Sequence, residues 1–268
     1  MNTDLSLFFS GEKLYGDDFS LTQILDWYAD EEEGYANLGA KFKDTYKYGY
    51  HEVNKLHGFR HLPTLQSINA LGIGSAYGDE FFPIANRLSN VTILDPSDTF
   101  SIYDNIHGVP CNYSKPNPSG DLPFASNHFN LVTSFGVMHH IPNVSHVIQE
   151  CYRCLSDGGM MLIREPIHSM GDWQKPRQGL TKRERGIPAK IMLDIIHGAG
   201  FNLKSMSACM FPLFPRIGRK LGFIAYNSKV ITLLDLLVSS SLKWNTKYHR
   251  TNYFEKFAPS SYFYVLEK

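Results

Sequence analysis

From residue 67 onward, short apolar runs alternate with stretches whose hydrophobic residues have helical spacing. This alternation is typical of βαβ units, in which each helix returns the chain to pair the next strand in parallel. It predicts an α/β fold, namely a doubly wound, Rossmann-like, mostly parallel sheet of seven strands. The runs that predict strands are residues 68–73, 91–94, 108–110 (weak), 129–134, 160–164, 201–207 and 259–268.

Two of the connecting helices are well marked. Between Pro142 and Leu155 the apolar residues form one helical stripe, and the pair Gly158-Gly159 predicts where that helix stops. The next predicted helix runs from Pro188 to Ala199 and begins with a proline, which the first turn of a helix tolerates.

The alternation does not extend over the whole chain. Residues 20–62 have a helical pattern rich in aromatic side chains, and residues 210–258 contain an amphipathic stretch at 229–242. We therefore predict one domain with three parts. These are a helical N-terminal cap (1–66), a Rossmann-like core (67–209 plus 259–268) and a helical insertion before the last strand (210–258).

Composition narrows the classes of function. The 268 residues include 26 Lys and Arg against 26 Asp and Glu, so the chain lacks the basic excess typical of nucleic-acid binders. Four cysteines are too few for a disulfide scaffold, and no metal-ligand spacing is present, so we expect no metal. The sequence shows neither a signal peptide nor a run long enough to span a bilayer, which favours a cytoplasmic protein.

A glycine-rich turn follows the first predicted strand, with the sequence Gly72-Ile-Gly74-Ser75-Ala-Tyr77-Gly78. Glycines let such a turn be tight and let a ligand approach the backbone. A dinucleotide-binding loop has its third glycine where this chain has Tyr77, so the pattern argues against a nicotinamide-dependent oxidoreductase.

Asp95 ends the second predicted strand, 21 positions after Gly74. A carboxylate at this place can accept two hydrogen bonds from the hydroxyls of a ribose. The alternative is that Asp95 caps the turn or helix that follows, a role open to Asp98 as well.

Three further motifs follow in order: Leu122-Pro-Phe, His139-His140-Ile-Pro, and Leu155-Ser-Asp-Gly-Gly. With the glycine turn and Asp95, this ordered set resembles the class I S-adenosylmethionine-dependent methyltransferases over residues 67–166. The resemblance implies S-adenosylmethionine as the cofactor. The chain departs from the family pattern at Gly72, where an acid is usual, and at Ala76, where a glycine is usual.

The resemblance also implies roles for individual residues. The turn containing Gly72, Gly74, Ser75 and Gly78 would lie under the methionine part of the cofactor, and Asp95 would hold the ribose. The remaining contacts that it implies are Asp121 and Leu122 beside the adenine, and Phe135 and Gly136 in the pocket wall.

Candidate proton acceptors follow the fourth and fifth strands, at the ligand-binding edge of such sheets. They are His140 with its neighbour His139, and then Glu165, His168 and Asp172. A histidine near its ordinary pKa is a natural base. Each of these residues could instead line the cofactor pocket, cap a helix or tie down a loop.

Basic residues crowd the loop before Pro188: Arg177, Lys182, Arg183 and Arg185. Such a cluster can clamp a phosphate or carboxylate, and the loop sequence resembles that of bacterial methyltransferases associated with sugars and polysaccharides. The alternative is an ordinary solvated loop, in which Glu184 pairs with these cations.

The expected function is therefore methyl transfer to an oxygen or nitrogen of a small polar acceptor bearing a glycan or phosphate, such as a sugar or nucleotide-sugar. Two alternatives stay open. One is a natural-product or quinone-type methyltransferase with an apolar acceptor, which the 13% aromatic content suits. The other is a cofactor-binding pseudo-enzyme without catalysis. The sequence leaves open whether the chain forms a homo-oligomer.

Overall fold

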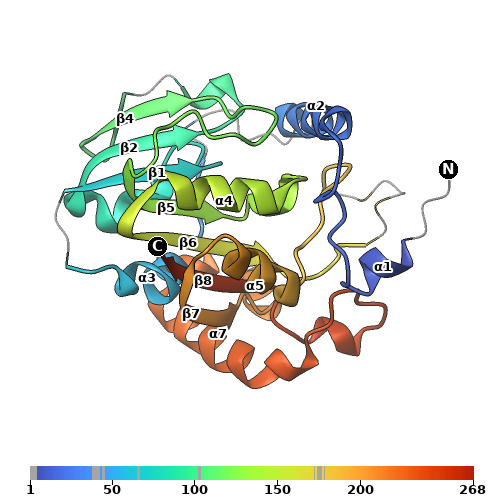
Figure 1. Ribbon diagram of the computed structural model, residues 1–268. Coiled ribbons are helices and arrows are strands. Elements are labelled where there is room, and N and C mark those ends of the chain that lie inside the picture. Colours follow the sequence, from blue (N-terminus) through green and yellow to red (C-terminus); the bar gives the residue numbers. More distant parts are fainter. Residues whose placement is uncertain are drawn as a thin grey trace.

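The structure is a computed structural model that describes residues 5–37, 43, 46–64, 67–101, 104–171, 173, 177 and 179–268, with only the backbone described at 32–37 and 99. Its centre is an eight-stranded sheet with the strand order β3-β4-β2-β1-β5-β6-β8-β7 (Figure 1). The strands are β1 (Ile68–Ile73), β2 (Leu88–Leu94), β3 (Asn105–Ile106), β4 (Val109–Ser114), β5 (Phe129–Phe135), β6 (Leu155–Pro166), β7 (Asn202–Cys209) and β8 (Ser261–Glu267).

The predicted doubly wound, mostly parallel sheet is confirmed. Strands β4, β2, β1, β5 and β6 are parallel, and β8 runs antiparallel between β6 and β7. The count differs from the predicted seven because β3, a two-residue strand, pairs antiparallel with β4 at the sheet edge.

Helices cover both faces of the sheet and leave one buried core on each side (Figure 1). One core includes apolar residues of α4 (Val144–Cys154) and α5 (Ala189–Gly198). The other core includes Val53 of α3 (His51–His57) and, at its margin, residues of α7 (Lys229–Leu242).

One local prediction was wrong. The pair Gly158-Gly159 does not stop a helix, because α4 already ends at Cys154 and both glycines lie within β6. The connection between β1 and β2 is a 3-10 helix, η2 (Asp79–Arg87), which contains Pro83; proline cannot donate the backbone hydrogen bond of an α-helix interior.

Two further regions position the site and its surroundings. Near the N-terminus, α1 (Ser6–Phe9) precedes α2 (Leu21–Asn37), which lies beyond the carboxyl ends of the parallel strands (Figure 1). Between β7 and β8 lie α6 (Leu213–Leu221), η5 (Ala225–Asn227), α7, η6 (Lys243–Asn245) and η7 (Phe254–Lys256). Within the described residues, no helix combines the length and apolar character needed to cross a membrane.

Candidate functional site

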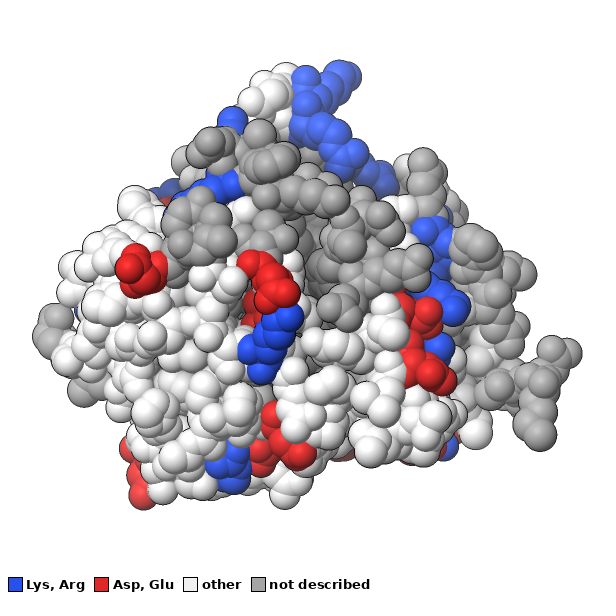
Figure 2. Space-filling view, turned by 90° about the horizontal axis from the view of Figure 1, so that it is seen from above, with Lys and Arg blue, Asp and Glu red and all other residues white. Residues whose placement is uncertain are grey.

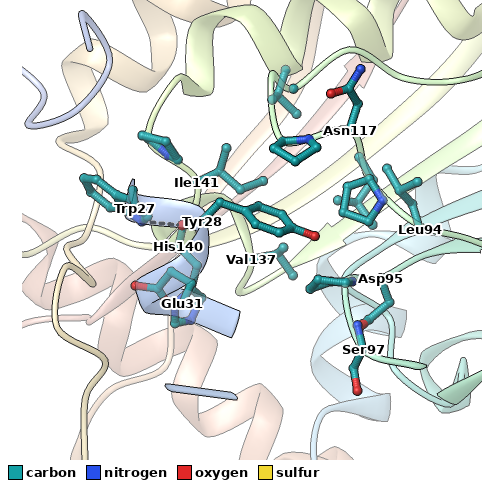
Figure 3. Close-up of a pocket in the computed structure, with 18 of the residues that line it drawn as sticks. Trp27, Tyr28, Glu31, Leu94, Asp95, Ser97, Asn117, Val137, His140 and Ile141 are labelled. Atoms are coloured by element: carbon teal, nitrogen blue, oxygen red, sulfur yellow. Dashed lines mark hydrogen bonds and ion pairs between the residues drawn. The ribbon is translucent and has the colours of Figure 1, made fainter. Parts of the chain in front are cut away.

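A cavity of about 400 Å³ opens at the carboxyl ends of β1, β2 and β5, beneath α2 (Figure 3). Its size is within the range of small-molecule sites, about 300–1,000 Å³. One side is formed by the segments that follow the strands, and the other by α2. Residues that line it include Gly74, Ala76, Asp95, Ser97, Asn117, Asp121, Leu122, Gly136, Val137 and His140 from the sheet side, and Ile24, Trp27, Tyr28 and Glu31 from α2.

The glycine turn brings backbone to the cavity wall at Gly74. This residue has φ +60°, and a Cβ built on it would lie 2.6 Å from the side chain of Val137. A larger residue would therefore collide with Val137, so glycine lets the turn pack directly against this residue of the cavity wall. Ser75 and Gly78 lie behind the lining and help to shape the turn, since the amide of Gly78 donates to the carbonyl of Ser75.

The neighbouring side chains explain why residue 72 is a glycine, without reference to a ligand. A Cβ there would collide with the hydroxyl of Ser75. That hydroxyl donates to the buried carboxyl of Glu80 (2.9 Å), which also accepts from the hydroxyl of Thr133 (2.6 Å). Burial raises the pKa of Glu80 to about 7, although both hydrogen bonds oppose the shift. Glu80 therefore places a carboxyl group beneath the turn of a chain that lacks the usual acid at Gly72.

Asp95 makes turn-capping contacts of the kind considered from the sequence. One carboxylate oxygen accepts from the amide of Ser97 (3.0 Å) and the other from the amide of Ala76 (3.2 Å). The side chain also lies at the cavity wall (Figure 3). Each carboxylate oxygen can accept more than one hydrogen bond, so the contacts within the chain leave capacity for a ribose diol. Burial raises the pKa of Asp95 to about 6, against the effect of both amides.

The structure brings Asp121 and Leu122 to the cavity but not Phe135. Phe135 faces the other core, where its ring lies 6.1 Å from Phe59 and 5.5 Å from Phe263. The following two residues, Gly136 and Val137, form the wall instead.

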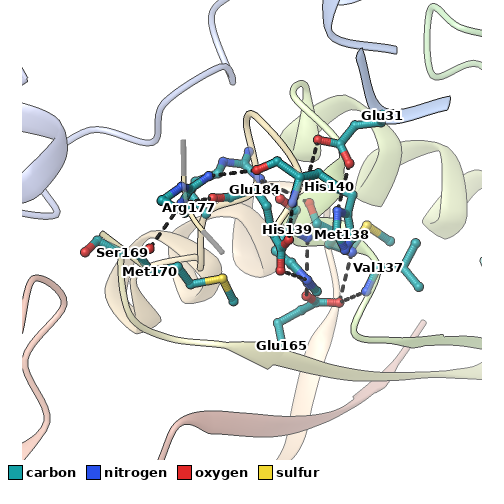
Figure 4. Close-up of polar contacts among 12 residues, drawn as sticks. Glu31, Val137, Met138, His139, His140, Glu165, Ser169, Met170, Arg177 and Glu184 are labelled. Atoms are coloured by element: carbon teal, nitrogen blue, oxygen red, sulfur yellow. Dashed lines mark hydrogen bonds and ion pairs between the residues drawn. The ribbon is translucent and has the colours of Figure 1, made fainter. Parts of the chain in front are cut away.

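Glu165 fixes the short 3-10 helix η4 (Met138–His140) that borders the cavity (Figure 4). Its carboxylate accepts from the amides of Val137 (2.9 Å), Met138 (3.0 Å) and His139 (3.3 Å), and contacts Nδ1 of His139 at 2.7 Å. The side chain is 1% exposed and is not part of the cavity wall. These contacts describe a positioning residue and lend no support to the catalytic role expected for Glu165.

His139 lies between two carboxylates. Its Nε2 faces Glu184 at 3.4 Å, on the opposite side of the ring from Glu165. Burial alone would lower the pKa of His139, but the two carboxylates outweigh it and raise the pKa to about 9. Donor atoms of His139, His140 and Glu184 also lie within 4.8 Å of one another, a spacing that a metal ion could span. In this structure the three residues form part of a network of ion pairs with Glu165 and Glu31.

His140 differs from His139 because it lines the cavity (Figure 4). Its Nδ1 lies 3.0 Å from a carboxylate oxygen of Glu31, and its carbonyl accepts from Nε1 of Trp27 (2.7 Å). Burial and the charge of His139 lower the pKa of His140, with Glu31 opposing them. The ring is therefore neutral at neutral pH, and a hydrogen on Nδ1 directed at Glu31 makes Nε2 the basic nitrogen.

His168, the third expected base, does not line the cavity. Within the described part of the chain its Nδ1 has no hydrogen-bond partner, and burial lowers its pKa to about 4. Asp172 lies outside the described residues.

The basic loop residues expected to bind the acceptor are engaged within the protein. Arg177 donates to the carbonyls of Glu184 (2.6 Å) and Thr181 (3.1 Å), and Arg183 pairs with Asp30 of α2 at 2.6 Å. The fully buried Arg185 donates to the carbonyls of Tyr15, His139 and Ile141, each at 2.9 Å.

Glu31, Trp27 and Glu80 were not identified as site residues from the sequence. Trp27 and Glu31 are four residues apart, so they share one face of α2. That spacing was a usable signal for the helix face that closes the cavity. For Glu80, the only signal was the missing acid at Gly72.

Comparison with known proteins finds similarity to methyltransferases. Residues 71–163 match the family model described as a methyltransferase domain. Over 114 residues the chain is 29% identical to the ubiquinone/menaquinone biosynthesis C-methyltransferase UbiE of Agrobacterium fabrum, covering 37% of this chain and 41% of that protein. The match to the Sinorhizobium fredii protein of the same name is 27% over 118 residues, 38% of this chain and 43% of that protein. The chain thus matches less than half the length of these curated relatives.

Solved structures share the fold at low sequence identity. An S-adenosylmethionine-dependent methyltransferase from Mesorhizobium loti superposes with a TM-score of 0.52 at 14% identity, covering 78% of this chain and 94% of that chain. The cyclase SpnF superposes with a TM-score of 0.53 at 14% identity, covering 81% and 79%. Because one fold can serve several reactions, these likenesses establish architecture alone. Together with the family match over residues 71–163, they show a methyltransferase domain at these residues, on the fold of S-adenosylmethionine-dependent methyltransferases.

Proposed function

We propose that this protein transfers a methyl group from S-adenosylmethionine to a hydroxyl oxygen of a small, ring-bearing acceptor bound beneath α2. The observation that carries the proposal is the pair formed by His140 and Glu31. It lies in the wall of the same cavity that contains Asp95 and the backbone at Gly74.

The residues that line the cavity suit the separate parts of the cofactor. Gly74 brings backbone without a side chain to the cavity wall, Asp95 can accept from the ribose hydroxyls, and Asp121 and Leu122 border the place expected for the adenine. When bound, S-adenosylmethionine supplies an electrophilic methyl group on a positively charged sulfur. The protein's contribution is then to align the acceptor and to accept its proton.

His140 is suited to accept that proton. During transfer of the methyl group to the acceptor oxygen, the hydroxyl proton of the acceptor would move to Nε2 of His140, in the tautomer whose Nδ1 hydrogen points at Glu31. The imidazolium formed in this way is stabilised by the Glu31 carboxylate, 3.0 Å from Nδ1. General-base assistance of this kind contributes about 10²–10⁴-fold to a rate.

The acceptor class follows from the cavity lining. Trp27, Tyr28, Tyr46 and Phe100 contribute aromatic rings, and the Tyr28 ring extends from α2 into the space between His140 and Asp95 (Figure 3). Aromatic walls favour planar, largely apolar ligands. The curated relatives act in ubiquinone and menaquinone biosynthesis, which also supports a quinone-type or phenolic ring.

A glycan- or phosphate-bearing acceptor, the class expected from the sequence, receives less support. It was inferred from Arg177, Arg183 and Arg185, and the guanidinium groups of all three already bind carbonyls or Asp30. The second candidate is instead methylation of a ring carbon, which the C-methyltransferase names of the relatives favour. On a phenolic ring that reaction also needs a base to remove the hydroxyl proton.

The test is methyl transfer by the purified protein to a panel of phenols and hydroquinones, with S-adenosylhomocysteine as the measured product and mass spectrometry to locate the methyl group. We expect His140→Gln to lower kcat by about 10²–10⁴-fold without changing the affinity for S-adenosylhomocysteine. Glu31→Gln should lower kcat less and shift its pH profile. The exposed His197, changed to Gln, is the matched control. Full activity of His140→Gln on a confirmed acceptor would refute the assigned role.

A further inference from the structure

The segment between β7 and β8 exposes an unusual amount of apolar surface. All of residues 210–258 are described, and they include most of the large apolar side chains that the described part of the chain exposes to solvent. Single exposed apolar residues are ordinary, whereas a concentration of them in one segment marks an interaction surface. We call this the insertion face, which comprises Leu213, Leu221, Phe223, Ile224, Val230, Leu233, Leu234, Leu237, Trp244, Tyr253, Phe254 and Phe257.

Helix α7 turns its apolar stripe outward. Val230 is 66% exposed and Leu237 65%, and Leu233 and Leu234 lie between them on the same side of the helix. The spacing continues to Trp244, seven residues after Leu237 and 77% exposed. In Figure 1, α7 lies along the lower side of the molecule, away from α2.

The inward side of α7 combines apolar residues at the margin of the core with buried polar side chains. Asp235 is 0% exposed and accepts from the amides of Met210 (2.9 Å) and Phe211 (2.6 Å) and from the hydroxyl of Tyr226 (3.1 Å). Thr232 and Ser239 are buried on the same side. These bonds fix the rotation of the helix, so its apolar stripe cannot turn into the core.

The insertion face is also strongly basic. Residues 210–258 contain eight Lys and Arg but only two acids, whereas the rest of the chain has 18 Lys and Arg against 24 Asp and Glu. Both acids, Asp235 and Glu255, are buried, so the exposed charge is positive. Figure 2 views the molecule from above, which is the side away from α7. There, charged groups of both signs are separated by uncharged surface. The basic residues of the insertion are Arg216, Arg219, Lys220, Lys229, Lys243, Lys247, Arg250 and Lys256.

The charge argues against a second copy of the chain as the occupant. A symmetric dimer through the insertion face would bring two like-charged surfaces together. Exposed aromatic and aliphatic side chains in a segment rich in Lys and Arg are instead the pattern of a protein that lies in the interfacial region of an anionic bilayer.

We propose that the insertion face binds the surface of membranes that contain anionic lipids. Trp244, Phe254 and the α7 stripe enter the boundary between headgroups and acyl chains, and the cations of α6 and the ends of α7 contact the headgroups. The attachment is peripheral, consistent with the lack of a membrane-spanning helix in the described chain.

The insertion face connects physically to the cavity. The side chain of Asn227 donates to the carbonyl of Tyr48 (2.8 Å) and accepts from the amide of His51 (2.9 Å). Tyr46, two residues before Tyr48, lines the cavity. The binding proposal itself does not depend on the proposed function.

The experiment is co-sedimentation of the full chain with vesicles of phosphatidylcholine alone or mixed with phosphatidylglycerol. We expect binding to the mixed vesicles, weakened by salt, and little binding to phosphatidylcholine alone. Tryptophan emission gives a second readout, because Trp27 and Trp173 are 0% and 8% exposed while Trp244 is 77% exposed. A blue shift on adding mixed vesicles would then report Trp244 entering the bilayer.

Two sets of variants test the cationic and the apolar residues of the insertion face separately. Neutralising three cations should weaken binding about fivefold each, and hence roughly 100-fold together. The cationic set is Arg216→Gln, Arg219→Gln and Lys220→Gln, with Lys115→Gln, Lys190→Gln and Lys204→Gln as the control of equal charge. The apolar set is Val230→Ser, Leu237→Ser and Trp244→Ser, with Leu7→Ser, Leu21→Ser and Phe82→Ser as the control of similar exposure.

Loss of binding in both insertion sets, with both control sets binding like the parent, would support the proposal. It would be overturned if the folded parent did not bind mixed vesicles, or if the insertion and control sets lost binding equally. A concentration-dependent dimer that the apolar set abolishes, without vesicle binding, would also overturn it and assign the face to a second copy. Since no arm measures methyl transfer, failure here leaves the proposed function standing.

Discussion

Replacing Glu165 by glutamine should destabilise the protein more than any other isosteric change at the site. The carboxylate is 1% exposed and accepts from three consecutive amides and from Nδ1 of His139. An amide group has one acceptor oxygen and would turn an N–H₂ towards donors. At least one charge-assisted hydrogen bond is lost, worth about 1.5–3 kcal/mol, and the imidazolium loses its nearest counter-charge. The expected cost is about 3–5 kcal/mol in the free energy of unfolding.

The assay is urea unfolding of parent and variant, followed by circular dichroism at several pH values. The raised pKa of His139, about 9 against an ordinary 6.5, means that this ion pair stabilises the parent fully below pH 6.5 and is lost as pH rises through 9. Parent stability should therefore decline across that interval, and Glu165→Gln should flatten the decline. Glu267→Gln, which removes a surface pair with Lys204, should cost less than about 1 kcal/mol.

The reasoning fails if Glu165→Gln unfolds within about 0.5 kcal/mol of the parent, the size of an ordinary surface effect. Should such a stable variant also lose methyl transfer while still binding S-adenosylhomocysteine, Glu165 would act in the chemistry, as the sequence had suggested.

Three other substitutions test the cofactor site and its supports. Asp95→Ala should weaken S-adenosylhomocysteine binding by about 1.5–3 kcal/mol in calorimetry, and parent affinity should fall below pH 6, where the carboxylate that accepts from ribose becomes protonated; equal affinities would remove Asp95 from the site. Burial raises the pKa of Glu80 from 4.5 to about 7, so its contribution to stability is present below pH 4.5 and lost as pH rises through 7. Glu80→Gln should thus have a higher urea midpoint than the parent at pH 8, and a lower midpoint would contradict this. Arg183→Gln removes the pair with Asp30 and should lower the melting temperature without changing the acceptor KM; a salt-sensitive rise in KM would restore the anionic-acceptor hypothesis.

The central strands could be predicted from the sequence because a strand buried on both faces leaves a local signal. Runs such as Ile68–Ile73 and Phe129–Phe135 are rich in apolar residues and almost entirely buried, and glycine, proline or polar residues bound them. The two-residue β3 has no such signal. The position of β8 between β6 and β7 depends on pairing between distant segments, which no local pattern encodes.

Some residues of the candidate site could likewise be located from the sequence, and others could not. Gly74, Asp95 and His140 could be located because the ends of parallel strands meet at one edge, so their order along the chain predicts their proximity. The partner Glu31 lies 109 residues from His140, and only the packing of α2 brings the two together. Sequence also could not separate a free arginine from a buried one such as Arg185, whose partners are carbonyls that every residue carries.

The place of β8 has a consequence for how the chain assembles. Strand β7 pairs only with β8 among the described strands, and β8 follows it by way of the whole 210–258 segment. During synthesis, β7 and the outer side of β6 must therefore wait, unpaired, until residues 261–267 leave the ribosome. Open strand edges are sites of aggregation, and pairing over such a separation is slow. The interval between translation of residue 209 and residue 267 is thus when the nascent chain most needs protection by a chaperone.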